Sequence, residues 1–187
     1  MKNLILLFTI SFLLIGCGGS KEVTSKNVDL DEAPEWYDQA PSDPNYLFAV
    51  SSATSKDMQM AVDKASTSAR AEIGIQVEAK IQGLQKKFDE ETGLGEDAQY
   101  LSMFTEATKI IVSTTISGSK IDKRKTLKEG NIFRAYVLVS YPIGAANQAL
   151  VDQIKKNEQM YTRYRATKTF EELDKETEKF EQFKKGE

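Results

Sequence analysis

The feature that most constrains the fold is a long run of apolar residues spaced by steps of three and four. It extends from Met58 to Phe88 through Val62, Ala65, Ala69, Ile73, Val77, Ile81 and Leu84. Such steps place side chains on one face of an α-helix, so the pattern predicts one long amphipathic helix. The first half of that face is small, which lets a helix backbone approach a sheet closely, at Ala61, Ala65, Ser68 and Ala69.

Residue patterns typical of β-strands occur both before and after this helix in the sequence. A strand is predicted over residues 46–53, and Ser55 is expected to cap the long helix, with Asp57 in its first turn. After a second helix over residues 96–111, two arms at 120–127 and 132–141 flank Lys-Glu-Gly-Asn and predict a β-hairpin. The second arm has one wholly apolar face and is predicted to be central. The first arm carries four basic residues, as expected of an edge strand that resists aggregation.

The C-terminal part is predicted to be helical. Pro142 ends the hairpin, a helix is expected over 143–165, and Thr169 to Glu172 reads as a capping box for a last helix. The predicted fold class is therefore α+β, with a small, mostly antiparallel three-stranded sheet (strand, helix pair, hairpin) packed by helices. The α+β domain is assigned to residues 34–145 and a C-terminal helical extension to residues 146–187.

The N-terminus has the pattern of a secretory signal. A short basic start, Met1-Lys2-Asn3, precedes an apolar run from Leu4 to Ile15. Twelve helical residues span about 18 Å, which is too short for a bilayer core of about 30 Å. Residues 1–16 are therefore expected to be a signal peptide that takes no part in the fold.

The end of that run, Leu14-Ile15-Gly16-Cys17, resembles the lipobox of bacterial lipoproteins. The resemblance implies cleavage between Gly16 and Cys17, a diacylglyceryl thioether on Cys17 and an acyl chain on its new amino group. Two or more chains anchor a protein durably, so attachment to a membrane is expected. Residues 17–33 are expected to be the lipidated cysteine and a flexible tether. By resemblance, Gly18 favours the outer membrane, and the side that the protein faces, periplasm or exterior, stays open.

A second resemblance covers residues 34 to about 145. Pro34-x-Trp36, a strand ending in Ala49-Val-x-x-Ala53, the alanines that precede Arg70 on the long helix, and Tyr136-Val-Leu-Val139 carry it. In these features the chain resembles the Lpp-twenty family of bacterial lipoproteins, and it is similar to the N-terminal domain of a flagellar outer-membrane-ring assembly protein. The resemblance implies a compact α+β envelope domain and implies no catalysis.

The composition argues against several kinds of chemistry. The chain has no histidine, one cysteine and a formal net charge of −3, which disfavours zinc sites, disulfides and general nucleic-acid binding. Acidic residues crowd around Gly93 and Gly95 but are out of register for a calcium loop. We therefore expect no enzyme, no metal and no cofactor other than the lipid on Cys17.

Two surfaces are candidates for binding. An apolar seam on the last helix, Phe170, Leu173, Phe180 and Phe183, is a candidate surface for an envelope protein partner or a homo-oligomer. The second surface combines a Pro-rich strap, whose aromatic residues are expected to pack onto the domain, with the basic hairpin arm: Trp36, Tyr37, Lys123, Arg124 and Lys125. The favoured function is a lipid-anchored, non-enzymatic adaptor or structural component of the cell envelope. The alternative is a ligand-binding module for cell-wall or lipid fragments.

Overall fold

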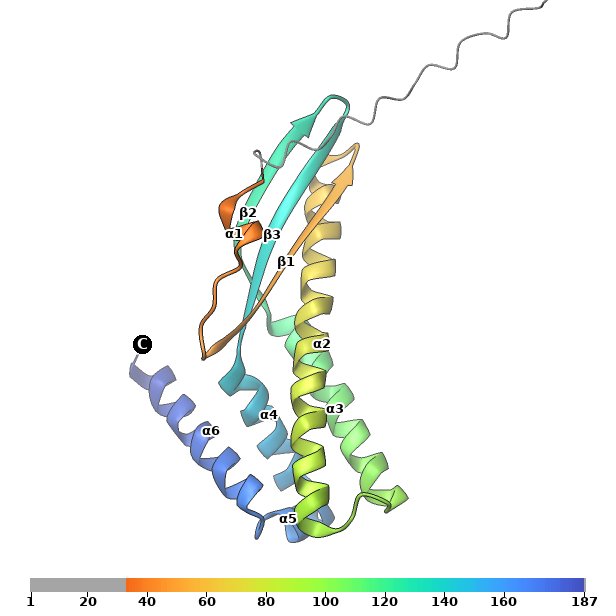
Figure 1. The fold of residues 1–187 in the computed structure, drawn as a ribbon, viewed down its shortest axis with the longest axis vertical. Helices are drawn as coiled ribbons and strands as arrows, with labels where there is room; N and C mark the ends of the chain where they lie inside the picture. Colours follow the sequence, from red (N-terminus) through yellow and green to blue (C-terminus); the bar gives the residue numbers. More distant parts are fainter. Residues whose placement is uncertain (1–32, 187) are drawn as a thin grey trace, which may run out of the picture. The chain divides into compact units, whose positions relative to one another are not determined.

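Six helices and one three-stranded sheet make up the described part of the chain, residues 33–186 of a computed structural model (Figure 1). In chain order they are α1 (Glu35–Asp38), β1 (Tyr46–Ser55), α2 (Met58–Thr92), α3 (Ala98–Gly118), β2 (Lys120–Glu129), β3 (Ile132–Pro142), α4 (Ile143–Lys156), α5 (Glu158–Tyr164) and α6 (Lys168–Gly186). The predicted α+β class is confirmed, and both strand pairs are antiparallel.

The sheet has the order β1-β3-β2, so β3 is central and β2 is an edge strand, as predicted. The hairpin turns at Gly130, whose φ of 60° lies in the left-handed region that favours glycine. Side chains alternate between the two faces of a strand. On one face, Ala135, Val137 and Val139 are fully buried in the core beneath α2.

The N-terminal half of α2 lies along this face of the sheet (Figure 1). Ala61, Ala65 and Ala69 are fully buried there, one helical turn apart. Since an alanine side chain is a single methyl group, the helix backbone can approach the strands closely. The three predicted alanines therefore form the contact between helix and sheet, whereas Ser68, which the prediction placed on the same face, is exposed.

The C-terminal half of α2 packs against helices instead. Its Phe88 ring centroid lies 4.6 Å from that of Tyr164 and 6.2 Å from that of Phe104. These three rings from α2, α3 and α5 are almost completely buried. Burial raises the pKa of the Tyr164 phenol to about 12, because the charged phenolate loses its solvation.

The C-terminal helices belong to the same compact unit as the sheet. Helix α4 packs against α3, α5 and α6, and α2 also contacts α5 and α6. Leu150 and Ile154 of α4 are fully buried in the common core. Residues 146–186 thus share one hydrophobic core with the sheet.

Two predicted helix caps are wrong by two residues. Strand pairing continues through Ser55, so α2 begins later and Asp57 is its N-cap, accepting from the Met60 N–H at 2.8 Å. At α6, the Thr167 hydroxyl accepts from the Phe170 N–H at 3.1 Å. The capping box predicted at Thr169 is not formed.

Three predicted segments also need correction. The helix expected over 143–165 is broken at Asn157, whose side chain accepts from the N–H groups of Gln159 and Met160 and caps α5. The second predicted helix, α3, continues to Gly118. The Pro-rich strap includes one helical turn, α1, directly after Pro34.

Candidate functional site

The predicted lipidation site cannot be placed. Gly16 and Cys17 lie outside the described residues, as does most of the tether over residues 17–33. None of the helices within residues 33–186 is long and apolar enough to cross a membrane.

The apolar seam of α6 is largely covered by the chain itself. Phe170 and Leu173 are only 5% and 3% exposed, and the Phe170 ring packs edge-on against Tyr161 at 5.9 Å. Phe180 is half-buried, and Phe183 is 53% exposed. The prediction that Phe170 and Leu173 offer a free partner surface is therefore wrong. The stripe docks on α4 because it completes the core of its own domain.

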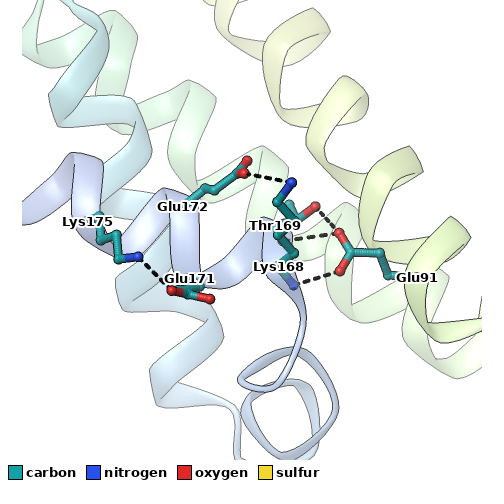
Figure 2. Close-up of polar contacts among 6 residues, drawn as sticks. All are labelled: Glu91, Lys168, Thr169, Glu171, Glu172 and Lys175. Carbon is teal, nitrogen blue, oxygen red and sulfur yellow. Dashed lines mark hydrogen bonds and ion pairs between the residues drawn. The ribbon is translucent and has the colours of Figure 1, made fainter.

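Polar contacts fix α6 at its start (Figure 2). The carboxylate of Glu91, near the end of α2, accepts from the backbone N–H groups of Lys168 at 2.7 Å and Thr169 at 3.1 Å. It also accepts from the Thr169 hydroxyl. The hydroxyl bond and the backbone bonds hold the pKa of Glu91 below its usual value. A carboxylate from another helix thus completes the N-terminus of α6.

The second candidate surface is only partly assembled. The Tyr37 ring meets Tyr136 of β3 edge-on at 4.9 Å, and its hydroxyl lies 3.2 Å from the Ser52 hydroxyl. Tyr37 therefore lies on the face of the sheet opposite α2. Trp36 is half-buried in α1, which packs against β3.

The register of β2 divides the predicted basic residues between the two faces. Lys125 pairs with Tyr136 and Lys123 pairs with Leu138, whereas Arg124 pairs with Val137. Residues directly opposite in a sheet share a face. Lys123 and Lys125 thus share the face of Tyr37, and Arg124 lies on the α2 face. The sequence cluster is split because neighbouring strand residues point in opposite directions.

Helix α3 forms a third candidate surface, which the sequence did not predict. It separates two grooves, of about 420 Å³ on the α2 side and about 200 Å³ on the α4 and α5 side. Ile116, 36% exposed, lines the first groove, and Ile110, 43% exposed, lines the second. The continuing apolar spacing beyond Ile111 could have revealed the longer helix, but not that its flanks stay open.

A third cavity, of about 430 Å³, lies where β1, α2, the end of β3, α6 and the N-terminus of α4 meet. It is lined by Tyr46 of β1, Lys80 of α2, Pro142, Ile143, Gly144 and Asn147 around the start of α4, and Glu176, Lys179, Phe180 and Phe183 of α6, together with Pro44 and Asn45. No sequence motif marks this site, because its residues are about 140 positions apart at the extremes.

Two of the acidic residues around Gly93, Asp97 and Glu91, have structural roles. Asp97 caps α3 by accepting from the N–H groups of Gln99 and Tyr100, and Glu91 completes α6. Within the described range, no group of acidic, cysteine or histidine side chains has an arrangement that could hold a metal ion.

Comparison with known proteins gives no family profile and no curated sequence that matches this chain. The resemblance to the Lpp-twenty family therefore stays a prediction based on the residues that carry it.

Proposed function

We propose that this chain is a lipid-anchored lipoprotein of the cell envelope, most consistent with the outer membrane, that acts as a non-enzymatic adaptor. The support for its address is Leu14-Ile15-Gly16-Cys17 behind a short apolar run. The lipid on Cys17 would hold the domain close to the membrane, where it meets its partner, a second envelope protein.

The observation that carries the adaptor role is the exposure of α3 between two grooves. Each groove has an isoleucine at its edge, Ile116 on one side and Ile110 on the other. A ridge with a groove on each side suits ridges-into-grooves packing with a partner helix. Since Phe170 and Leu173 of the α6 seam are already buried within the domain, α3 replaces the seam as the proposed partner surface.

Site-specific photocrosslinking in cells tests this role, with the full lipidated chain carrying the probe at position 110 or 116. Position 178 is a matched control, because Glu178 is exposed on α6. We expect one discrete heterologous product from positions 110 and 116 that is absent at 178, and the product from position 110 should be lost when Ile116→Lys is added. A product of twice the chain mass would indicate a homo-oligomer instead. Equal labelling at all three positions, or none, would contradict the adaptor role.

A second candidate function is binding of anionic cell-wall or lipid fragments on the outer face of the sheet. It is favoured by Tyr37, Lys123 and Lys125 sharing that face. Titration of Trp36 fluorescence with soluble peptidoglycan fragments or anionic vesicles would test it. Lys123→Gln should weaken a saturable shift and Arg124→Gln, on the other face, should not. A flat titration would remove this candidate.

A further inference from the structure

We propose that the outer edge of β1 pairs antiparallel with the β1 edge of a second copy of this chain, so that two three-stranded sheets join into one. This inference goes beyond the adaptor role, which concerns α3, and does not depend on it. Three observations support it: the backbone groups along the β1 edge, the lack of any feature that protects this edge, and the charges at its two ends.

Strand β1 is an outer strand of the sheet, with β3 on one side (Figure 1). On its other side, the N–H of Tyr46 donates to the carbonyl of Asp43 at 3.2 Å, in the turn that precedes the strand. The carbonyl of Phe48 accepts from the side chain of Gln76 of α2 at 3.1 Å. The backbone groups of these even-numbered residues of β1 therefore point away from β3.

The outward backbone groups continue along the strand. In an antiparallel ladder, alternate residues direct both their N–H and C=O groups to the same edge, so those of Val50, Ser52 and Thr54 also point away from β3. Within residues 33–186, β1 pairs with β3 alone, and no hydrogen bond joins these three outward pairs of groups to another element. They form a ladder that a further strand can use.

The two outer strands differ in how they are protected. Strand β2 has lysine or arginine at five of its ten positions, and its register shifts between Ile121 and Lys123. Charges and bulges of this kind keep a sheet edge from pairing with other chains. Strand β1 has neither, because none of its ten residues is charged or a proline and its register with β3 is unbroken. The sheet is therefore closed to pairing at β2 and open to it at β1.

The charges at the ends of β1 favour a second copy as the occupant. Asp43 precedes the strand and lies beside Tyr46, Lys56 follows the strand, and both charged residues are exposed. The outward groups are centred on Ser51, so a two-fold axis there places Lys56 of one copy beside Tyr46, and hence Asp43, of the other. One backbone bond to the Asp43 carboxylate, at 2.7 Å, leaves its second oxygen for this pair, whereas Asp57 already caps α2. Parallel pairing would instead bring like charges together at each end.

The same axis suits the surface of α2. Only two residues join β1 to α2, so the helix runs back along the strand, and the contact of Gln76 with Phe48 sets their relative level. Ser51 lies three strand residues further, about 10 Å, which corresponds to about seven helical residues. The axis therefore passes α2 close to the exposed Ser68, a small residue that permits close approach of a second helix. Ile75, two turns along the helix from Ser68 and 59% exposed, would be covered by such an approach.

Disulfide crosslinking of the full chain in its membrane tests the proposal, with products separated by non-reducing electrophoresis and weighed by mass spectrometry. Ser51→Cys should give a dimer, because residues at the axis form a pair with Cα atoms about 4.5 Å apart, within reach of a disulfide. Thr54→Cys should give none, since each copy's residue 54 lies six positions from its counterpart, about 20 Å. Asp122→Cys, on the edge formed by β2, is the matched control, and the parent chain shows the background from Cys17.

Two further variants, each added to Ser51→Cys, test the backbone ladder and the end charges separately. Val50→Pro removes an outward N–H and leaves the ladder to β3 intact, so the circular dichroism spectrum should stay that of the parent while the dimer yield falls about tenfold or more. Lys56→Glu changes an exposed residue outside the strand and should lower the yield about threefold. Adding Asp43→Lys to it reverses both charges of the pair and should restore the yield.

The proposal is overturned if Ser51→Cys gives no dimer, or if Thr54→Cys or Asp122→Cys gives as much dimer as Ser51→Cys. A Ser51→Cys product that contains a different protein would also overturn it, because the open edge would then serve another extended chain. Loss of the dimer in Lys56→Glu without rescue by Asp43→Lys would contradict the axis at Ser51. A failure of these experiments would leave the crosslinks at α3 unaffected.

Discussion

The N-terminal half of α2 packs against a sheet and its C-terminal half packs against helices, and the two halves use different side chains. Toward the sheet, Ala61, Ala65 and Ala69 are buried at one-turn intervals. Toward α3 and α5, the buried residues are larger, and Phe88 meets two other aromatic rings. One continuous helix thus joins a region of close backbone approach to a region that needs bulky side chains to fill the space between helices.

The largest effect is expected from removing the ring at the helical end. Phe88→Ala should lower the free energy of unfolding by about 3–5 kcal/mol, because it leaves a cavity between Tyr164 and Phe104. Chemical denaturation measures this. Phe183→Ala, at an exposed position, is the control and should change stability little. Equal effects of the two variants would show that the aromatic cluster is not a core.

Where α2 packs on the sheet, enlarging a buried side chain should lower the stability of the protein. Ala65→Leu should destabilise the protein by about 1–3 kcal/mol, since the new side chain must push α2 away from β3. Lys64→Leu adds the same residue on the exposed side and is the control. If thermal unfolding shows Ala65→Leu to be tolerated as well as its control, close approach is not what the alanines provide.

Polar contacts connect the C-terminal end of α2 to the start of α6. Glu91→Gln should cost about 1 kcal/mol at neutral pH, the usual worth of a helix cap, because it replaces the carboxylate that accepts three hydrogen bonds at the start of α6. Proteolysis followed by mass spectrometry should detect earlier cleavage near residues 165–170 than in the parent. No difference would indicate that Thr167 alone caps the helix.

The same carboxylate predicts a pH dependence. Folding lowers the pKa of Glu91 below 4.5, so its contribution is fully present above that pH and is lost as the pH falls through the folded value. The stability difference between parent and Glu91→Gln should therefore shrink below about pH 4.5. Denaturation curves at pH 7, 5 and 3 measure it, and a difference that is constant across these pH values would contradict the assignment.

The smallest effect is expected from the exposed pair Lys175–Glu171, one turn further along α6. Their side chains are 2.6 Å apart and lie in solvent. Water screens such pairs and ordering two long side chains costs entropy, so Lys175→Gln should leave the melting temperature unchanged within error. A clear drop would mean that charge along α6, rather than its cap, holds the helix.

Much of the fold could be predicted from local patterns. Apolar alternation and the Gly-Asn turn predict the three strands and the central place of β3. The apolar steps of three and four predict the length of α2. Caps were less predictable, since Ser55 and Asp57 are both good caps and the end of strand pairing decides between them. The break at Asn157 depends on a residue that apolar spacing ignores.

The candidate sites were harder to predict. The residue spacing on α6 predicts an apolar seam, but it does not show whether another protein or the chain's own α4 covers that seam. The basic residues of β2 are adjacent in the sequence and predict one patch, although strand geometry puts Arg124 on the opposite face from Lys123 and Lys125. The cavity at α4 had no sequence signal.

The sequence by itself determined the elements of this protein, because a helix or strand depends on residues within a few positions of one another. It also carries the proposed membrane address, which is a short linear motif. Tertiary structure alone decided that Glu91 would complete a helix 77 residues away, and that Lys80, Asn147 and Lys179 would line one cavity. Those contacts depend on how helices pack, and packing is set by the shape of the whole core rather than by any local pattern.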